Sequence, residues 1–172
     1  ASQDLNLVSL VTEPDNLFSP EIGIYVTGNS YQEWKKSENY TTNIRAWDPQ
    51  TQCNFVKKGK EWEREAVMTF IEKGEITLQQ NVGIRVKGAA TRSYASKSFN
   101  VYAREQYGKS KIKTNLLKRN YDINGKKINS YETLAIRSVY DDSRIRDKQL
   151  LQLVPFLPQY HYPQEIESYS LW

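Results

Sequence analysis

Four basic side chains surround a short loop of small and hydroxyl-bearing residues in the middle of the chain. Arg85 and Lys87 precede this loop, which spans residues 88–96. Arg92 lies within the loop, and Lys97 follows it directly. Hydroxyl groups, free backbone N–H groups and fixed positive charge together can hold a phosphate group. The loop has a single glycine and lacks the Walker spacing. Residue chemistry alone therefore favours an ordinary hairpin with solvated basic residues at its mouth.

The segments on both sides of the loop alternate between apolar and polar residues. The apolar positions are Val82, Ile84 and Val86 before the loop, and Phe99, Val101 and Ala103 after it. A period of two on both sides of a loop rich in small residues is typical of a β-hairpin. We therefore expect residues 80–104 to form two antiparallel strands joined by the basic loop.

Lys97 has the same strand parity as Phe99 and Val101. Its side chain should therefore project from the core face of the second strand. Burying an ammonium group is costly unless an anion or a carboxylate meets it. This position is an observation separate from the loop composition, and it favours an anion close to Lys97.

The rest of the chain predicts an α+β fold, a mostly antiparallel sheet with one clear helix near the C-terminus. Alternation predicts further strands at residues 5–11, 22–26, 62–72, 76–87 and 132–140. Asn124-Gly125 is a dipeptide that favours a type I′ hairpin turn. The period becomes helical at residues 143–154, where Ser143 suits the N-cap and Pro155 ends the helix.

A chain of 172 residues suits one domain, spanning residues 1–172. Residues 29–60 show no clear period, so we expect a long loop excursion with one helical turn near Trp34. Residues 155–172 contain three prolines and predict an irregular tail. The mean hydropathy is −0.72, and no apolar run approaches the roughly 20 residues of a membrane helix. We expect no membrane span. The first residue, Ala1, leaves open whether a signal peptide has been removed.

The composition of the chain disfavours several classes of enzymatic reaction. Cys53 and His161 are the only residues of their types, which excludes an internal disulfide and disfavours a zinc site of the usual His/Cys type. A Ser-His-Asp or Cys-His arrangement would rest on His161 in the proline-flanked tail, a poor place for a general base. The net charge of +4 is mild. The basic stretch at residues 109–127 is best explained as a solvated loop, and we expect no nucleic-acid partner.

Two further patterns have a functional and a structural explanation. Asp141 and Asp142 are adjacent carboxylates that suit a Mg²⁺ site, although capping of the following helix is the favoured explanation. Trp34, Trp47 and Trp62 lie in or beside the excursion and would suit a sugar-stacking platform. Aromatic residues are more often part of a core, because each buries a large apolar area.

Four segments together resemble a known family: LVSLVTEPDNLFSPEIGIYVTG, WEREAVMTFIEKG, NVGIRVKGAATRSYASKSFNVYAR and LAIRSVYDDSRIRDKQLLQ. In this order and spacing they resemble the N-terminal part of spore coat protein H-like (CotH) proteins, an atypical kinase family. The similarity runs from Leu5 to about Leu153. Its most specific motifs are Arg92-Ser93-Tyr94, Lys97-Ser98 and the Arg-Ile-Arg-Asp sequence at residues 144–147.

The resemblance implies transfer of phosphate from ATP, with Mg²⁺, to Ser or Thr hydroxyls of a protein substrate. It implies a two-lobed kinase-like body, of which this chain is the N-terminal lobe. Within that lobe it implies that Lys97 lies near the nucleotide phosphates and that the loop at residues 88–96 covers them. The nucleotide-binding residues implied are Arg85, Lys87, Arg92, Ser93 and Lys97.

The sequence departs from the family at its C-terminal side. The catalytic and metal-binding aspartates of the family lie in a C-terminal lobe, and the residues up to Trp172 do not show that pattern. Without a carboxylate-held Mg²⁺, most of the electrostatic catalysis is lost. We therefore expect the chain to be inactive alone, and we assign no catalytic residue or metal ligand within it.

An alternative function is a non-catalytic interaction module that keeps the fold without the chemistry. Such a module would bind a spore-coat protein, another cell-surface partner or a polysaccharide. Either function implies an extracellular location, at the bacterial cell surface or in the spore coat.

Overall fold

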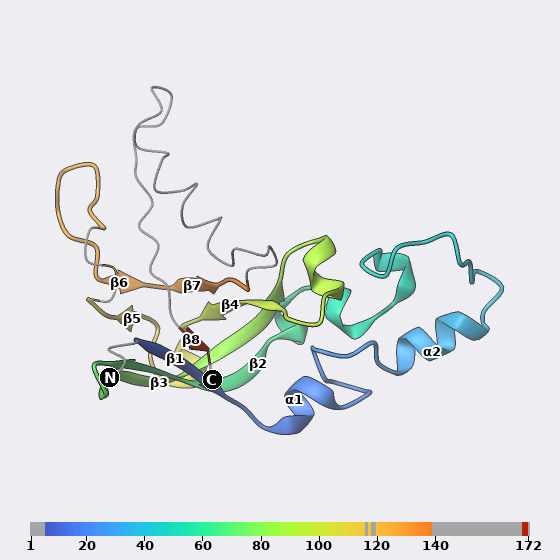
Figure 1. Cartoon of the computed structure of the whole chain (residues 1–172), viewed down its shortest axis with the longest axis horizontal. Helices are drawn as coiled ribbons and strands as arrows, with labels where there is room; N and C mark the ends of the chain where they lie inside the picture. Colours follow the sequence, from blue (N-terminus) through green and yellow to red (C-terminus); the bar gives the residue numbers. More distant parts are fainter. Residues whose placement is uncertain (1–5, 116, 118–119, 139–169, 172) are drawn as a thin grey trace, which may run out of the picture.

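The computed structural model describes residues 6–115, 117, 120–138 and 170–171. Its main feature is a six-stranded sheet with the strand order β7-β4-β3-β2-β1-β8 (Figure 1). Only the β1–β8 pair is parallel, and the other neighbours are antiparallel. The strands are β1 (Leu7–Val11), β2 (Arg64–Glu72), β3 (Glu75–Lys87), β4 (Ser98–Tyr102), β7 (Thr133–Ile136) and β8 (Ser170–Leu171). The predicted antiparallel sheet is confirmed.

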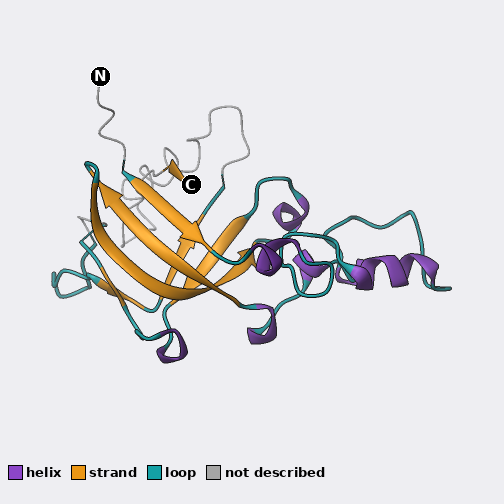
Figure 2. Cartoon of the chain, turned by 90° about the horizontal axis from the view of Figure 1, so that it is seen from below, coloured by secondary structure: helices purple, strands orange, loops and turns teal. Residues whose placement is uncertain are grey.

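The centre of the sheet is a meander of consecutive strands. Lys73 and Gly74 form the tight β2–β3 turn, and both have positive φ, which such two-residue hairpin turns require. Val86 pairs with Phe99 and Gly83 with Tyr102, so β3 and β4 are antiparallel as predicted. Figure 2 shows the long strands curving strongly, with most of the helical segments beyond one end of the sheet.

Alternation places one row of apolar residues on the core face of this sheet. Met68, Val82 and Val101 have no exposed surface. The buried set comprises Val8, Ile24, Ala66, Met68, Phe70, Val82, Ile84, Val86, Phe99, Val101, Ala103 and Ile112. Burial of a side chain of this size is worth roughly 1.5–3 kcal/mol, so the core face holds the strands in register.

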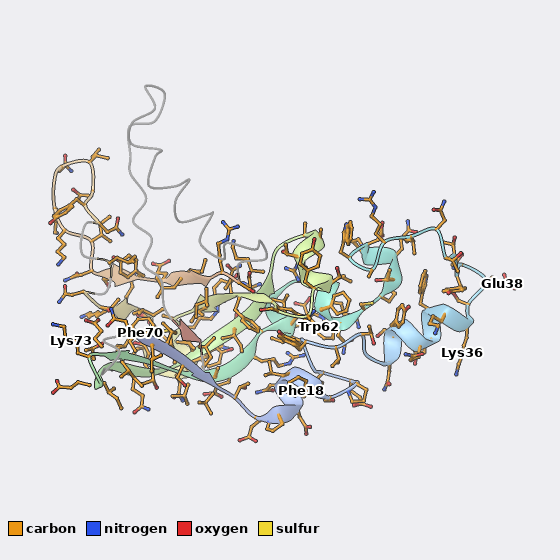
Figure 3. All side chains as sticks on the ribbon, viewed as in Figure 1. Phe18, Lys36, Glu38, Trp62, Phe70 and Lys73 are labelled. Atoms are coloured by element: carbon orange, nitrogen blue, oxygen red, sulfur yellow. The ribbon has the colours of Figure 1, made fainter. Side chains whose placement is uncertain are left out.

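The excursion at residues 29–60 contains more regular structure than its sequence predicts. It begins with helix α2 (Asn29–Lys36), which has no buried residue. In Figure 3 the labels of Lys36 and Glu38 lie at the opposite end of the molecule from Phe70 and Lys73. The remaining short elements are α1 (Pro14–Phe18), η1 (Pro49–Thr51), η2 (Asn54–Val56), η3 (Lys60–Trp62), η4 (Ala90–Ser93), η5 (Glu105–Tyr107), β5 (Ile112–Lys113) and β6 (Ser130–Tyr131).

The predicted strand at residues 22–26 is wrong. Ile24 and Tyr25 donate their backbone N–H groups to residues of α1, whereas the carbonyl of Val26 accepts from Phe55. Because these hydrogen bonds go to two separate helical segments, α1 and η2, and not to a neighbouring strand, no β-ladder forms. Ile24 is nevertheless 2% exposed, so the apolar pattern predicted burial correctly and the type of element incorrectly.

The turn at Asn124-Gly125 forms, but it is not type I′. Gly125 has φ of 77° and Asn124 has no positive φ, although type I′ needs positive φ at both central residues. Asp122 explains the difference, because its Oδ1 accepts hydrogen bonds from the backbone N–H groups of Asn124 and Lys126 at 2.9 Å. An Asx side chain thus replaces the turn that the dipeptide favours.

The predicted helix at residues 143–154 lies outside the described residues, as does the predicted tail at residues 155–172 apart from the two residues of β8. Among the helices that the structure does describe, none combines the length and the apolar character needed to cross a membrane.

Candidate functional site

The β3–β4 loop folds against η2 at one end of the sheet. The loop contains η4, and the two short helices are joined through the side chain of Arg92. Arg92 donates from Nε to the carbonyl of Gly88 at 2.6 Å and from Nη1 to those of Phe55 and Lys57 at 3.0 and 3.2 Å. A planar guanidinium suits this multiple contact, because its donors are fixed in a fork.

Lys97 is buried on the core face, as its parity predicts. The residue is 6% exposed, and its Nζ donates to the carbonyls of Arg92 at 2.7 Å and Tyr94 at 2.6 Å. The ammonium also lies 4.9 Å from the ring centre of Tyr25 and 4.6 Å from that of Phe55, within cation–π range. An ammonium has three N–H donors, so the described contacts use two of them. We call Tyr25, Phe55, Arg92 and Lys97 the Lys97 cluster.

The basic side chains at this end of the molecule donate their hydrogen bonds to neutral acceptors. Lys57 donates to Ser30 Oγ at 2.7 Å and Asn54 Oδ1 at 3.3 Å, and its ammonium lies over Trp62. Within the described residues, neither Lys57, Arg92 nor Lys97 forms an ion pair with a carboxylate. Burial lowers the pKa of all three side chains, because removal from water disfavours the charged form. The arrangement therefore leaves an excess of positive charge with acceptors that bear no charge.

Arg85 and Lys87 do not join the Lys97 cluster. They share strand parity with Gly83 on β3, opposite to the buried face that carries Val82 and Val86. Of the five residues predicted to bind a nucleotide, the structure brings together Arg92, Ser93 and Lys97. Ser93 donates from Oγ to the carbonyl of Ala90 at 2.8 Å and so stabilises η4.

Arg85 instead belongs to a cluster around the buried carboxylate of Glu63. Arg104 donates to both oxygens of Glu63, at 2.8 and 3.0 Å. Tyr107 donates from its hydroxyl to Oε1 at 3.1 Å, and Arg85 Nε lies 3.4 Å from Oε2. The hydrogen bond to Glu63 raises the pKa of Arg104, and burial, then Glu63, raise that of Tyr107. The carboxylate thus neutralises the arginines on this face and none of the cations around Lys97.

Sequence reasoning did not single out Tyr25, Phe55 or Glu63. Phe55 comes from a stretch without a clear period, and Tyr25 comes from a predicted strand that the structure does not contain, so no pattern linked either residue to the hairpin. The sequence showed that a buried Lys97 needs polar partners, but we expected those partners to be anions and not backbone carbonyls and aromatic rings. Glu63 stands one residue before β2, where a polar residue needs no explanation.

The three tryptophans do not form one platform. Trp62 packs against the main core, and Trp47 packs against a small core of Cys53, Phe55 and Val56. Trp34 lies apart on α2, where it contacts the rings of Tyr31 and Tyr40.

Other candidate groups carry no site within the described residues. Cys53 is 1% exposed and burial raises the pKa of its thiol, which makes it unreactive. The described residues contain no group of three or more His, Cys, Asp or Glu side chains placed to hold a metal ion. Asp141, Asp142, His161 and the motif at residues 144–147 lie outside the described part of the chain.

Comparison with known proteins finds no match to this chain among protein-family models, curated proteins or solved structures. The fold and the site therefore define the protein by themselves: an α+β domain whose central hairpin ends in a basic surface loop that is followed by a buried lysine.

Proposed function

We propose that this chain is the N-terminal lobe of a CotH-like protein kinase module, and that the Lys97 cluster contacts the phosphates of ATP. The observation that supports it is the buried ammonium of Lys97, which among the described residues has two neutral acceptors, no carboxylate partner and one remaining N–H. A buried cation in these surroundings favours an incoming anion. In protein kinases a lysine of the N-terminal lobe contacts the nucleotide phosphates beneath a covering loop.

The described residues fit the two parts of Mg-ATP differently. The polyphosphate suits the third N–H of Lys97 and the excess positive charge around it. Mg²⁺ needs carboxylate ligands, and the described residues bring no such group together. We therefore propose that the metal ligands and the catalytic aspartates come from a further lobe. The kinase would then transfer phosphate to Ser or Thr hydroxyls of a protein substrate only when that lobe is present.

Isothermal titration of this chain with Mg-ATP tests the binding step. We expect binding that Lys97→Met weakens at least about tenfold, because the charged hydrogen bond to phosphate is lost. Lys58→Met is the matched control, since Lys58 is exposed and outside the cluster. No binding by the wild-type chain, or equal binding by Lys97→Met, would reject the assignment. Retained protein phosphorylation by a longer Lys97→Met protein that includes the catalytic lobe would reject it independently.

A second candidate function is a non-catalytic extracellular or spore-coat module that binds a polysaccharide or a coat protein. It is supported by the aromatic group on α2, where Tyr31 and Trp34 stack at 5.9 Å and Tyr40 meets Trp34 edge-on at 5.1 Å. Tyr40 is exposed and Tyr31 and Trp34 are half-buried, and aromatic surface that remains exposed suits sugar rings or protein partners. Affinity electrophoresis in a gel that contains a soluble neutral glucan tests this candidate. Retardation that Trp34→Ala abolishes would support it, and unchanged mobility of the wild-type chain would reject glucan binding.

A further inference from the structure

Tyr25 contacts Lys97 in two independent ways. Its hydroxyl accepts a hydrogen bond from the backbone N–H of Lys97 at 3.1 Å and donates one to the carbonyl of Ala95 at 2.7 Å. Its ring lies 4.9 Å from the ammonium at the other end of the same lysine. One side chain therefore fixes both the backbone at the start of β4 and the charged group that this backbone carries.

Tyr25 is itself held firmly. Its ring meets Phe18 at 6.0 Å and Phe99 at 6.1 Å, and its backbone N–H donates to the carbonyl of Leu17 at 3.0 Å. These contacts come from α1 and from β4, two parts of the chain that are far apart in sequence. A residue supported from both sides can hold a neighbour in one position, because its own conformation is already fixed.

We propose that Tyr25 is a positioning residue for Lys97, and that it directs the free N–H of the ammonium toward the phosphates of a bound nucleotide. This role rests on the proposed nucleotide site. The carbonyls of Arg92 and Tyr94 take two of the donors, and the rings of Tyr25 and Phe55 border the ammonium. The third N–H is the donor left for an external acceptor, and loss of the Tyr25 ring would let the ammonium adopt other orientations.

The ring and the hydroxyl can be separated by two substitutions. Tyr25→Phe keeps the ring and removes both hydroxyl hydrogen bonds, whereas Tyr25→Leu removes the ring as well. Tyr40→Leu is the matched control, because Tyr40 is 41% exposed and its ring contacts Trp34 rather than the Lys97 cluster. Circular dichroism verifies that each variant is folded.

The first measurement is the rate at which an N-hydroxysuccinimide acetate reagent acetylates the Lys97 amine, followed by peptide mass spectrometry. The amine of a lysine that is 6% exposed reacts only when its surroundings open. We expect Tyr25→Leu to raise the rate at least about tenfold, and Tyr25→Phe and Tyr40→Leu to change it by less than about threefold. The exposed Lys35 and Lys58 serve as internal references whose rates stay constant.

The second measurement is the Kd for Mg-ATP of the same variants. We expect Tyr25→Leu to weaken binding about tenfold or more, Tyr25→Phe to weaken it a few-fold, and Tyr40→Leu to leave it unchanged. If the wild-type chain fails to bind Mg-ATP, the nucleotide site is rejected, while the acetylation rates still report whether Tyr25 holds Lys97. If Tyr25→Leu folds and reacts like the wild-type chain, the positioning role is overturned. If Tyr25→Leu does not fold, Tyr25→Met replaces it, since methionine also lacks the ring and fills more of its volume.

Discussion

The carboxylate of Glu63 lies directly against the backbone of Gly83, in the space that a side chain at position 83 would need. A Cβ on Gly83 would lie 2.6 Å from Cδ of Glu63 and 2.7 Å from Cγ, distances that real Cβ atoms essentially never show. Glu63 cannot easily withdraw, because Arg104 and Tyr107 hold its oxygens. The glycine and the buried carboxylate therefore depend on each other.

Gly83→Ala should destabilise the protein by about 1–3 kcal/mol, the usual range for an overpacked site. In a Glu63→Ala background the same change should cost clearly less, because the obstructing carboxylate is gone. Urea unfolding of the wild-type protein, both single variants and the double variant measures this coupling. Strictly additive effects would show that Glu63 is not what excludes a side chain at position 83.

Glu63→Gln should destabilise the protein by about 1–3 kcal/mol, because Arg85 and Arg104 keep 23% and 34% of their side-chain surface exposed to solvent. The change leaves the guanidiniums of Arg85 and Arg104 facing a neutral amide, and breaking a buried ion pair on one side is strongly destabilising. Glu65→Gln is the control, because Glu65 is exposed, and it should stay within about 0.5 kcal/mol of the wild type. Equal free energies of unfolding for the two variants would mean that the buried ion pairs contribute no more than a surface charge.

Arg92→Lys should loosen the β3–β4 loop even though the charge is kept. A lysine cannot reproduce the fork that reaches the carbonyls of Gly88, Phe55 and Lys57, and loss of charged hydrogen bonds costs about 2 kcal/mol. Hydrogen exchange measured by mass spectrometry should show faster exchange in residues 88–97. Arg45→Lys, which changes an exposed arginine, should leave that exchange unchanged. If Arg92→Lys exchanges hydrogen in residues 88–97 at the wild-type rate, other contacts must fix the conformation of the loop.

The contribution of Lys97 to the free energy of unfolding should change with pH in the alkaline range. Burial lowers the pKa of Lys97 in the folded protein below its ordinary value of 10.5. Between the lowered value and 10.5 the unfolded chain binds more protons than the folded one, so the free energy of unfolding increases as pH rises. Lys97→Met lacks this titration. The wild-type free energy of unfolding minus that of Lys97→Met should therefore rise with pH toward 10.5 in urea unfolding series. A difference that stays constant with pH would contradict the lowered pKa.

Strand positions were predictable because alternation shows which residues face a core, and this does not depend on which other residues pack against them. The same rule predicted the burial of Lys97 correctly. Parity also separates Arg85 and Lys87 from Lys97, yet the prediction grouped them because they are close in sequence. The contacts of Tyr25 and Phe55 were not predictable, since they depend on how irregular segments pack rather than on a repeating pattern. The family resemblance and the nucleotide site stay predictions.

The strand order carries a consequence for how the molecule assembles. β2, β3 and β4 are consecutive, so their pairing closes only short loops, whereas β1 pairs with β2 across the whole stretch from residue 12 to residue 63. Longer loops cost more entropy to close, and distant contacts form more slowly. Tyr25 and Phe55 lie in that stretch. We therefore expect the hairpin that bears Lys97 to form early in folding and the aromatic surroundings of its ammonium to form later, an order that pulse-labelled hydrogen exchange during refolding would resolve.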